Sequence, residues 1–262
     1  MFRFRPQTCD RNVYHSVVEL NEYRLPEKIA ATDVIIDVGA HIGSFTWACL
    51  QRGAGLVVAF ETDCWNLELA LEHLAEYGPR VRLSRRAVWR SDRPATELWF
   101  SGYTMAPGEL NTGGGTVHGD VVDGENDERT AALPTERVTT IALDEVLREF
   151  PQVRLLKLDC EGSEWPILLT SSELGRVEAV CGEFHLTADY SWLPASRHLN
   201  DLGLLNTQVL ETFLLRYFRE VQVCRTRDGL GHFWASQPQT RPVGIAEAET
   251  QGRLYDGLAG SQ

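Results

Sequence analysis

Two acidic residues and a glycine-rich turn are the first features of the chain that could carry out chemistry. Asp37 opens the turn Asp-Val-Gly-Ala-His-Ile-Gly, which ends at Gly43, and Glu61 comes about 20 residues after Gly39. Glycines allow the backbone of such a turn to bend tightly and to approach a ligand closely. In dinucleotide-binding folds an acidic residue at that distance accepts hydrogen bonds from ribose hydroxyls. The combination predicts a nucleoside-binding site.

The turn differs from a dinucleotide fingerprint, and the difference indicates which nucleoside it binds. The fingerprint needs Gly-x-Gly-x-x-Gly, but His41, next to Ala40, occupies the second glycine position. The side chain of His41 would obstruct a pyrophosphate, and the carboxylate of Asp37 would repel one. S-adenosylmethionine, a cationic nucleoside without phosphates, fits this turn better. The alternatives are an NAD(P)-dependent oxidoreductase of Rossmann type, or acidic residues that only cap the following helices.

A second group of polar residues lies at the ends of two later apolar runs. Asp159 and Glu161 end one run, and Glu183 and His185 end the next. Residues two apart in a strand share a face, so each pair should point the same way. A hydroxyl group that is to accept a methyl group must lose its proton, either to a base within about 3 Å or with the help of a divalent ion. We therefore expect a catalytic cluster composed of Asp159, Glu161, Glu183 and His185. If a divalent ion such as Mg or Mn is bound, its ligands would be Asp159, Glu183 and His185.

The same residues also have structural interpretations that the sequence leaves open. Lys157 and Asp159 could form an ion pair, and Glu161 and Glu164 could be charges at the start of a helix. A histidine at a strand end, such as His185, is often hydrogen bonded within the core. A protein that binds the cofactor without catalysis is therefore a further alternative, although a scaffold would gain nothing from the desolvation cost of so many buried charges.

The elements that must position these residues alternate between strands and helices. The predicted strands are the apolar runs at 34–38, 56–60, 81–89, 153–160 and 179–185, and the predicted helices lie between them. This order implies a parallel sheet with right-handed crossovers and helices on both faces. Two later runs, 221–226 and 231–236, flank an Asp-Gly pair and predict an antiparallel hairpin. We expect an α/β fold of the class I methyltransferase type, Rossmann-like and doubly wound, with a mostly parallel seven-stranded sheet and a C-terminal antiparallel hairpin.

The same patterns predict how the chain is divided. We expect one methyltransferase domain over residues 1–236, which begins with a lead-in helix at 13–32. The glycine-rich stretch 108–135 is too long for an ordinary connection and is expected to act as a lid, with His118 as a second candidate base. Residues 237–262 are rich in Gln, Pro, Gly and Glu and are expected to form a flexible tail.

The composition and charge of the chain limit the kinds of molecule that we expect it to bind. The chain has 262 residues and a net charge of −12, which argues against nucleic acid as a main partner. No apolar run approaches the roughly 20 residues of a membrane span, and the N-terminus lacks an apolar signal core. The six cysteines form no Cys-x-x-Cys pair, as expected for reduced thiols. We expect a cytoplasmic protein, a homodimer, that takes a small hydroxylated acceptor and contacts neither nucleic acid nor membrane.

Several ordered motifs resemble the FkbM-type methyltransferases. They are the strand and turn at 34–43, Phe-Glu at 60–61, Asn-Glu-Tyr-Arg-Leu-Pro at 21–26, Asn-Thr-Gly-Gly at 111–114, Thr-Ile-Ala-Leu-Asp at 140–144, the segment 156–164 and Glu-Phe-His at 183–185. The resemblance covers roughly residues 13–190. The family turn often reads Gly-Ala-Asn-Ile-Gly, so His41 is a departure. The resemblance implies a methyltransferase that uses S-adenosylmethionine to methylate a hydroxyl, often of a sugar or of a specialised metabolite such as an antibiotic.

The predicted cofactor-binding residues come from the turn, from the strand ends and from the motifs of the resemblance. They are Tyr23, Asp37, Gly39, Ala40, His41, Gly43, Glu61, Thr62, Arg86, Ala87 and Asn111.

Overall fold

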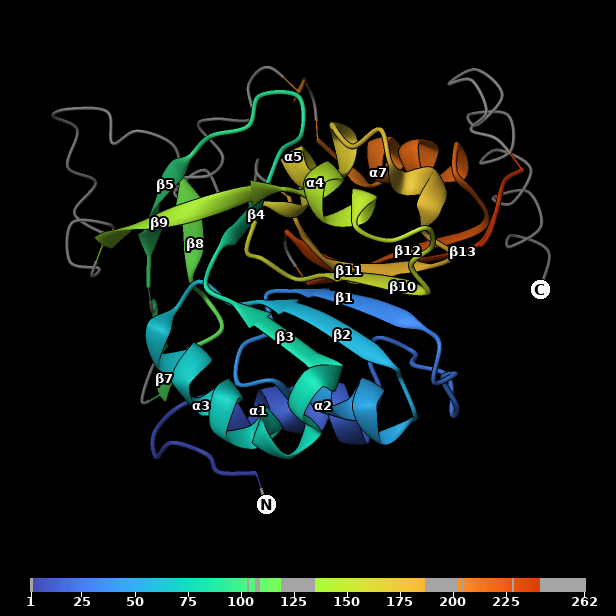
Figure 1. Ribbon diagram of the computed structural model, residues 1–262. Helices are drawn as coiled ribbons and strands as arrows, with labels where there is room; N and C mark the ends of the chain where they lie inside the picture. Colours follow the sequence, from blue (N-terminus) through green and yellow to red (C-terminus); the bar gives the residue numbers. More distant parts are fainter. Residues whose placement is uncertain are drawn as a thin grey trace, which may run out of the picture.

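Figure 1 shows the computed structural model of the chain. It describes residues 2–102, 104–106, 109–118, 135–186, 202–203, 205–227 and 229–240. The tip of the predicted lid, residues 119–134, and residues 241–262 of the predicted tail lie outside this described part, as does the side chain of His118.

The centre of the molecule is a seven-stranded sheet in the order β12-β13-β11-β10-β1-β2-β3. Its strands are β1 (Val34–Val38), β2 (Leu56–Phe60), β3 (Val81–Ser84), β10 (Leu155–Leu158), β11 (Val180–His185), β12 (Phe218–Arg227) and β13 (Leu230–Pro238). β13 runs antiparallel to both of its neighbours, and the other pairings are parallel. β1 and β2 are covered on both faces and are accordingly apolar throughout, except for Asp37 in β1. The predicted fold class, including the C-terminal hairpin, is confirmed.

Helices cover both faces of this sheet (Figure 1). One face carries α1 (Asp10–Tyr14), the π-helical η1 (His15–Glu19), α2 (Ser44–Gln51) and α3 (Cys64–Leu74), which continues into the 3-10 helix η2 (Ala75–Arg80). The other face carries α4 (Leu143–Arg148), α5 (Glu164–Leu169), the 3-10 helix η3 (Leu174–Arg176) and α7 (Thr207–Leu215). A separate apolar core fills each side, around Phe45 on the first face and Trp165 on the second.

The start of α3 agrees with its sequence signal. The carboxylate of Asp63 accepts a hydrogen bond from the backbone N–H of Asn66 at 2.8 Å, so Asp63 is the N-cap that the sequence predicts. This cap fixes the chain immediately after Glu61, which is the acidic residue at the end of β2.

The predicted strand 81–89 is in fact two strands in different sheets. β3 ends at Ser84, and β4 (Ala87–Trp89) pairs instead with β9 (Thr135–Ala142). β4 and β9 form a four-stranded sheet with β5 (Glu97–Ser101) and β8 (Thr116–His118), and β6 (Thr104–Ala106) pairs with β7 (Glu109–Asn111). The break lies at two exposed arginines, Arg85 and Arg86, because β4 turns away to bury Trp89 in a third small core.

The predicted lead-in helix 13–32 is wrong in extent. Helical structure runs from Asp10 to Glu19, and the chain from residue 20 to residue 33 is irregular. Asn21 and Arg24 have φ values of 52° and 54°, in the left-handed region that a helix cannot contain. Pro26 also lacks an N–H to donate. The segment is therefore an extended cover rather than a helix.

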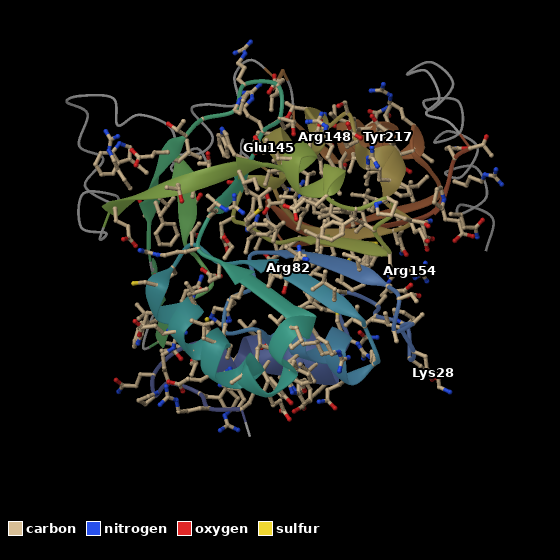
Figure 2. The ribbon with its side chains drawn as sticks, in the orientation of Figure 1. Lys28, Arg82, Glu145, Arg148, Arg154 and Tyr217 are labelled. Atoms are coloured by element: carbon tan, nitrogen blue, oxygen red, sulfur yellow. The ribbon has the colours of Figure 1, made fainter. Side chains whose placement is uncertain are left out.

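The hairpin also extends beyond the predicted boundary, since β13 ends at Pro238 rather than at residue 236. In the part of the chain that the structure describes, no helix has the length and apolar character needed to cross a membrane. Arg82, Arg148 and Arg154, labelled in Figure 2, lie on the outside, and each pairs with a glutamate 2.7 to 3.3 Å away.

Candidate functional site

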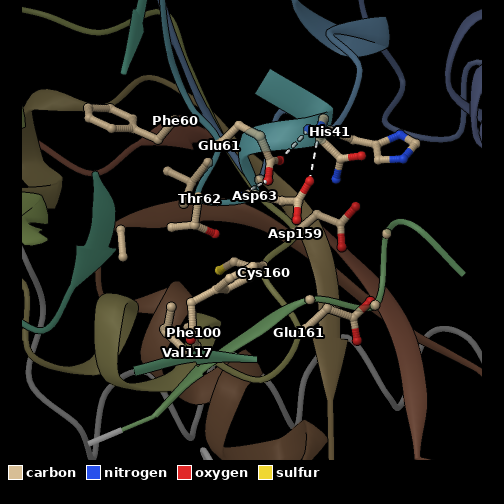
Figure 3. Close-up of a pocket in the computed structure, with 18 of the residues that line it drawn as sticks. His41, Phe60, Glu61, Thr62, Asp63, Phe100, Val117, Asp159, Cys160 and Glu161 are labelled. Carbon is tan, nitrogen blue, oxygen red and sulfur yellow. Dashed lines mark hydrogen bonds between the residues drawn. The ribbon is translucent and has the colours of Figure 1, made fainter. Parts of the chain in front are cut away.

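A cavity of about 430 Å³ opens at the carboxyl ends of β1, β2, β10 and β11. This is the edge at which open α/β sheets bind their ligands. Most of the predicted residues line it, namely Gly39, His41, Glu61, Thr62, Arg86, Ala87, Asn111, Asp159, Glu161, Glu183 and His185. Figure 3 shows Glu61, Asp159 and Glu161 around the cavity. Their individual roles remain predictions.

Glu61 is held rigidly at the end of β2. One carboxylate oxygen accepts a hydrogen bond from the backbone N–H of His41 at 2.7 Å, and the other accepts one from the N–H of Asp63 at 2.8 Å. Burial raises the pKa of Glu61 to about 7, although these two hydrogen bonds act in the opposite direction. Each oxygen keeps a lone pair that can accept a ribose hydroxyl. The arrangement suits the role predicted for Glu61.

Gly39 and Gly43 are needed for close packing as well as for the turn. Gly39 has a φ of 80°, and a Cβ added there would lie 1.7 Å from the carbonyl oxygen of Asp159. The turn after β1 is therefore pressed against the end of β10. Gly43 has a φ of 86° and faces the side chain of Leu74. Gly43 and Ala40 do not line the cavity, so we correct their placement: they support the turn from behind.

Asp37 lies beneath the turn rather than in the cavity. It is completely buried, 3.2 Å from Nζ of Lys157, and accepts a hydrogen bond from Oγ1 of Thr46 at 2.7 Å. Lys157 also donates to the carbonyl oxygen of Gly39 at 2.5 Å. Burial alone would lower the pKa of Lys157, but the carboxylates of Asp37 and Asp159 outweigh it and raise the pKa. The structural ion pair of Lys157 is therefore real, with Asp37 as its nearer partner.

Tyr23 also lies behind the cavity wall. Its hydroxyl donates a hydrogen bond to Oδ2 of Asp159 at 2.8 Å, and Nζ of Lys157 is 3.8 Å from the same oxygen. Burial would raise the pKa of Asp159, but Lys157 and Tyr23 together lower it. Tyr23, predicted to contact the cofactor, instead positions Asp159, which is held as a weak base.

His185 is sandwiched between two carboxylates. Its Nε2 lies 3.1 Å from Glu161, and its Nδ1 lies 3.5 Å from Glu164. Burial by itself lowers the pKa of His185, but the two carboxylates outweigh burial and raise the pKa well above its usual value. His185 is therefore an imidazolium that fixes Glu161 in the cavity.

The turn before α5 is fixed by Glu164. The carboxylate of Glu164 accepts hydrogen bonds from the backbone N–H groups of Cys160 and Gly162 at 2.8 and 2.9 Å. Ser163 lies at the N-cap of α5 but makes no capping hydrogen bond. The interpretation of Glu164 as a charge at the helix start is confirmed.

The predicted metal ligands do not fit a metal ion. A ligating histidine must offer a neutral nitrogen lone pair, but both ring nitrogens of His185 face carboxylates. Within the described ranges, no group of three His, Cys, Asp or Glu side chains is placed to hold a metal. For Asp159, Glu183 and His185 this leaves the acid–base roles that the sequence predicts, and those roles stay predictions.

Glu183 differs from the other acids of the cluster. No hydrogen bond or ion pair joins its carboxyl group to another described residue, and it lines the cavity. Burial and the neighbouring charge of Asp159 raise the pKa of Glu183 to about 9. Among these acids, Glu183 is the one whose carboxylate, once ionised, binds a proton most strongly.

Sequence reasoning missed residues of the N-terminal segment. The buried carboxylate of Asp10 pairs with Arg5 at 2.7 Å and accepts a hydrogen bond from Oγ1 of Thr112 at 2.9 Å. Thr112 in turn lies 2.8 Å from Nε2 of His41. No local pattern reveals this network, because its members are far apart in the chain; the Asn-Thr-Gly-Gly motif was its only visible part.

The cavity fits a cationic nucleoside. The residues that line it include five acids, Glu61, Asp63, Asp159, Glu161 and Glu183, against two cationic side chains, Arg86 and the imidazolium of His185. Two other side chains that line it, His41 and Ser163, each have a buried polar atom without a hydrogen-bond partner in the described structure. Acidic walls and free hydrogen-bonding atoms match the sulfonium, ammonium and hydroxyl groups of S-adenosylmethionine.

The solved structures that resemble this one in fold have low sequence identity to the chain and low TM-scores. The 23S rRNA methyltransferase ErmE is 11% identical with a TM-score of 0.42, covering 96% of this chain and 79% of its own. TrmK of M. capricolum, solved with S-adenosyl-homocysteine, is 8% identical with a TM-score of 0.42, covering 88% and 73%. The precorrin-6y C5,15-methyltransferase of Geobacter metallireducens is 13% identical with a TM-score of 0.40, covering 89% and 92%. At these scores the likeness bears on neither substrate nor mechanism.

The family is given by the sequence itself. No curated protein matches the chain. The family model described as the methyltransferase FkbM domain matches residues 37–214, which include the turn, Glu61 and the cluster at β10 and β11. The match covers more than half of the chain, which therefore belongs to the FkbM family of S-adenosylmethionine-dependent methyltransferases.

Proposed function

We propose that the protein transfers a methyl group to a hydroxyl oxygen of a small acceptor, a sugar or a specialised metabolite. The observation that carries this proposal is the place of Glu183, a half-buried carboxyl group that lines the cavity and has no hydrogen-bond or ion-pair partner among the described residues. Burial and the charge of Asp159 raise its pKa to about 9. A neutral hydroxyl is a weak nucleophile and needs a base beside it. Glu183 supplies one.

In this proposal the residues that line the cavity have separate roles. S-adenosylmethionine, when bound, supplies an electrophilic methyl group on a sulfonium. Glu61 holds the ribose, and the carboxylates around the cavity stabilise the positive charge of the donor. The same charge favours the ionised form of Glu183. As the acceptor oxygen gains the methyl group, its proton passes to the Glu183 carboxylate.

The remaining charged residues position the reactants. Asp159, fixed by Tyr23 and Lys157, and Glu161, fixed by His185, accept hydrogen bonds from other hydroxyls of the acceptor. Such fixed acceptors hold the attacking oxygen in line with the methyl group, which is where most of the acceleration of a displacement comes from.

The test is to incubate the protein with S-adenosylmethionine carrying a ¹³C-labelled methyl group and a panel of sugars and hydroxylated metabolites. The carbon chemical shift of the product methyl group distinguishes oxygen from nitrogen or carbon as the acceptor atom. We expect an O-methyl product from the natural protein and from the control Glu145→Gln, which changes an exposed residue of α4. Glu183→Gln should lower the rate by about 10²- to 10⁴-fold. An N-methyl or C-methyl product would overturn the proposal.

A further inference from the structure

His41 has one ring nitrogen that is tied to the protein and one that is not. Its Nε2 lies 2.8 Å from Oγ1 of Thr112 and 3.5 Å from Oδ1 of Asp10. Its Nδ1 is buried and has no hydrogen-bond partner among the described residues, while the side chain lines the cofactor cavity. A buried polar atom without a partner is costly, so a ligand that reaches Nδ1 would remove that cost.

The hydrogen bonds around Thr112 decide where the proton of His41 lies. The threonine hydroxyl has a single proton, and it donates this proton to the carboxylate of Asp10 at 2.9 Å. Its oxygen must therefore accept in the contact with His41, so that Nε2 carries the imidazole proton. Burial lowers the pKa of His41 to about 4, so the ring is neutral near pH 7. Nδ1 is then a lone-pair acceptor.

Asp10 can impose this direction because it is itself fixed. It is completely buried, and Nε and Nη2 of Arg5 donate to its two oxygens at 2.8 and 2.7 Å. Burial would raise the pKa of Asp10, but the hydrogen bonds and charge of Arg5 outweigh burial and lower the pKa to about 2. Asp10 is therefore ionised, and a carboxylate can only accept.

The backbone of the turn holds the ring in place. The N–H of His41 donates to Glu61 at 2.7 Å, and its φ is 51°, a left-handed value that few side chains adopt. Strained conformations of this kind persist only where the surroundings fix them, and they gather at ligand sites.

We propose that Asp10 and Thr112 hold His41 as its Nε2–H tautomer, so that Nδ1 accepts a hydrogen bond from an N–H or O–H group of the bound cofactor. The N-terminal segment then belongs to the cofactor site, because Asp10 acts on the ring of His41 through Thr112. This role is independent of the acceptor, so it stands or falls separately from the proposed O-methylation.

The first test needs no variant. Nitrogen NMR of the full chain labelled with ¹⁵N-histidine distinguishes the two tautomers of His41. We expect the Nε2–H tautomer in the free protein and a displacement of the Nδ1 resonance when S-adenosylhomocysteine is added to saturation. An Nδ1–H tautomer in the free protein, or an Nδ1 resonance that saturating S-adenosylhomocysteine leaves unmoved, would overturn the proposal.

The second test separates positioning from mere stability. Thr112→Val removes the hydroxyl at nearly constant shape, whereas Thr112→Ser keeps it. We expect Thr112→Val to give a mixture of His41 tautomers and to weaken the calorimetric affinity for S-adenosylhomocysteine by about 5- to 20-fold, and Thr112→Ser to restore both. His41→Asn, which tolerates the left-handed backbone, should lose a similar factor. Unchanged tautomer and affinity in Thr112→Val would contradict the proposal.

Discussion

Glu183 combines a chemical advantage with a cost in stability. The burial that makes its carboxylate a strong base also opposes its ionisation. Its pKa in the folded protein, about 9, is above the ordinary value of 4.5. The folded state therefore binds more protons than the unfolded state between these pH values, and the stability associated with Glu183 is lost as the pH rises through about 9.

The direction of this pKa shift predicts how replacing Glu183 changes the stability of the protein. At pH 8 the unfolded natural protein has an ionised Glu183, which must take up a proton on folding, whereas Glu183→Gln has no such cost. We therefore expect the variant to be more stable than the natural protein at pH 8, by about 1–2 kcal/mol. At pH 5 the two proteins should differ little, because this pH is close to 4.5 and the unfolded state then gains little by ionising Glu183. Urea denaturation at both pH values measures the difference. A variant that is less stable at pH 8 would show that the carboxylate is well solvated or paired.

The same group predicts the dependence of activity on pH. A base must be ionised, so kcat/KM for the cofactor, which reports the free protein, should rise with pH toward about 9. The positive charge of bound S-adenosylmethionine lowers the pKa of Glu183, so kcat should reach its plateau at lower pH. Initial rates across this range provide the check. A kcat profile that lies at higher pH than that of kcat/KM would exclude Glu183 as the base.

The contacts of His185 predict how methyl-transfer activity responds to the removal of metal ions. Both of its nitrogens face carboxylates, which leaves no lone pair for a metal ion. We expect EDTA, followed by gel filtration into metal-free buffer, to leave the rate of methyl transfer unchanged. A loss of activity that Mg or Mn restores would contradict this assignment.

A tight backbone contact joins the turn after β1 to the end of β10. It predicts that Gly39→Ala costs at least about 3 kcal/mol of stability, since the new Cβ would meet backbone rather than a movable side chain. Gly203→Ala is a matched control, because Gly203 has nearly the same φ, 78° against 80°, and no atom of the described residues lies within 4 Å of a Cβ added there. Backbone strain alone should cost the control about 1–2 kcal/mol. Equal losses in the two variants would mean that the turn relaxes.

The elements that the sequence predicts well are those whose patterns are local. β1, β2, α3 and the hairpin follow from apolar runs, the Asp63 cap and the Asp-Gly turn. The split between β3 and β4 could not be foreseen, because it depends on the pairing of β4 with β9, about 50 residues further along the chain. The lead-in helix failed for a similar reason, since the left-handed residues Asn21 and Arg24 pack against other elements.

The residues of the candidate site likewise differ in whether the sequence predicts their placement. The strand ends and their acids could be predicted because parallel strands bring their carboxyl ends to one edge. Which acids face the cavity could not be predicted. Asp37 lies within β1 and is buried against Lys157, whereas Asp159 follows the end of the neighbouring β10 and lines the cavity. The departure at His41 could be seen in the sequence, and so could the motif that contains Thr112, but the contacts that join His41 to Thr112 and Asp10 could not.

Across the whole molecule, the N-terminal segment reaches the cofactor turn through Asp10, which a buried ion pair with Arg5 holds in place. Arg5→Ala would leave Asp10 buried without its cation, and we expect a loss of about 3–5 kcal/mol of stability. Arg3→Ala is the control, because Arg3 pairs with Glu72 at the surface, where such pairs contribute about 1 kcal/mol or less. Thermal unfolding of both variants at pH 7 makes the comparison. Similar small losses would show that the segment is loosely attached.

The central claim is that the acid-lined cavity at the ends of β1 and β2 binds the methyl donor, with Glu61 on its ribose. Calorimetric titration of S-adenosylmethionine into the natural protein and into Glu61→Gln tests it most directly. We expect one site per chain and an affinity at least about tenfold weaker in Glu61→Gln. Absence of binding to the natural protein, or equal affinity in the two proteins, would contradict the claim.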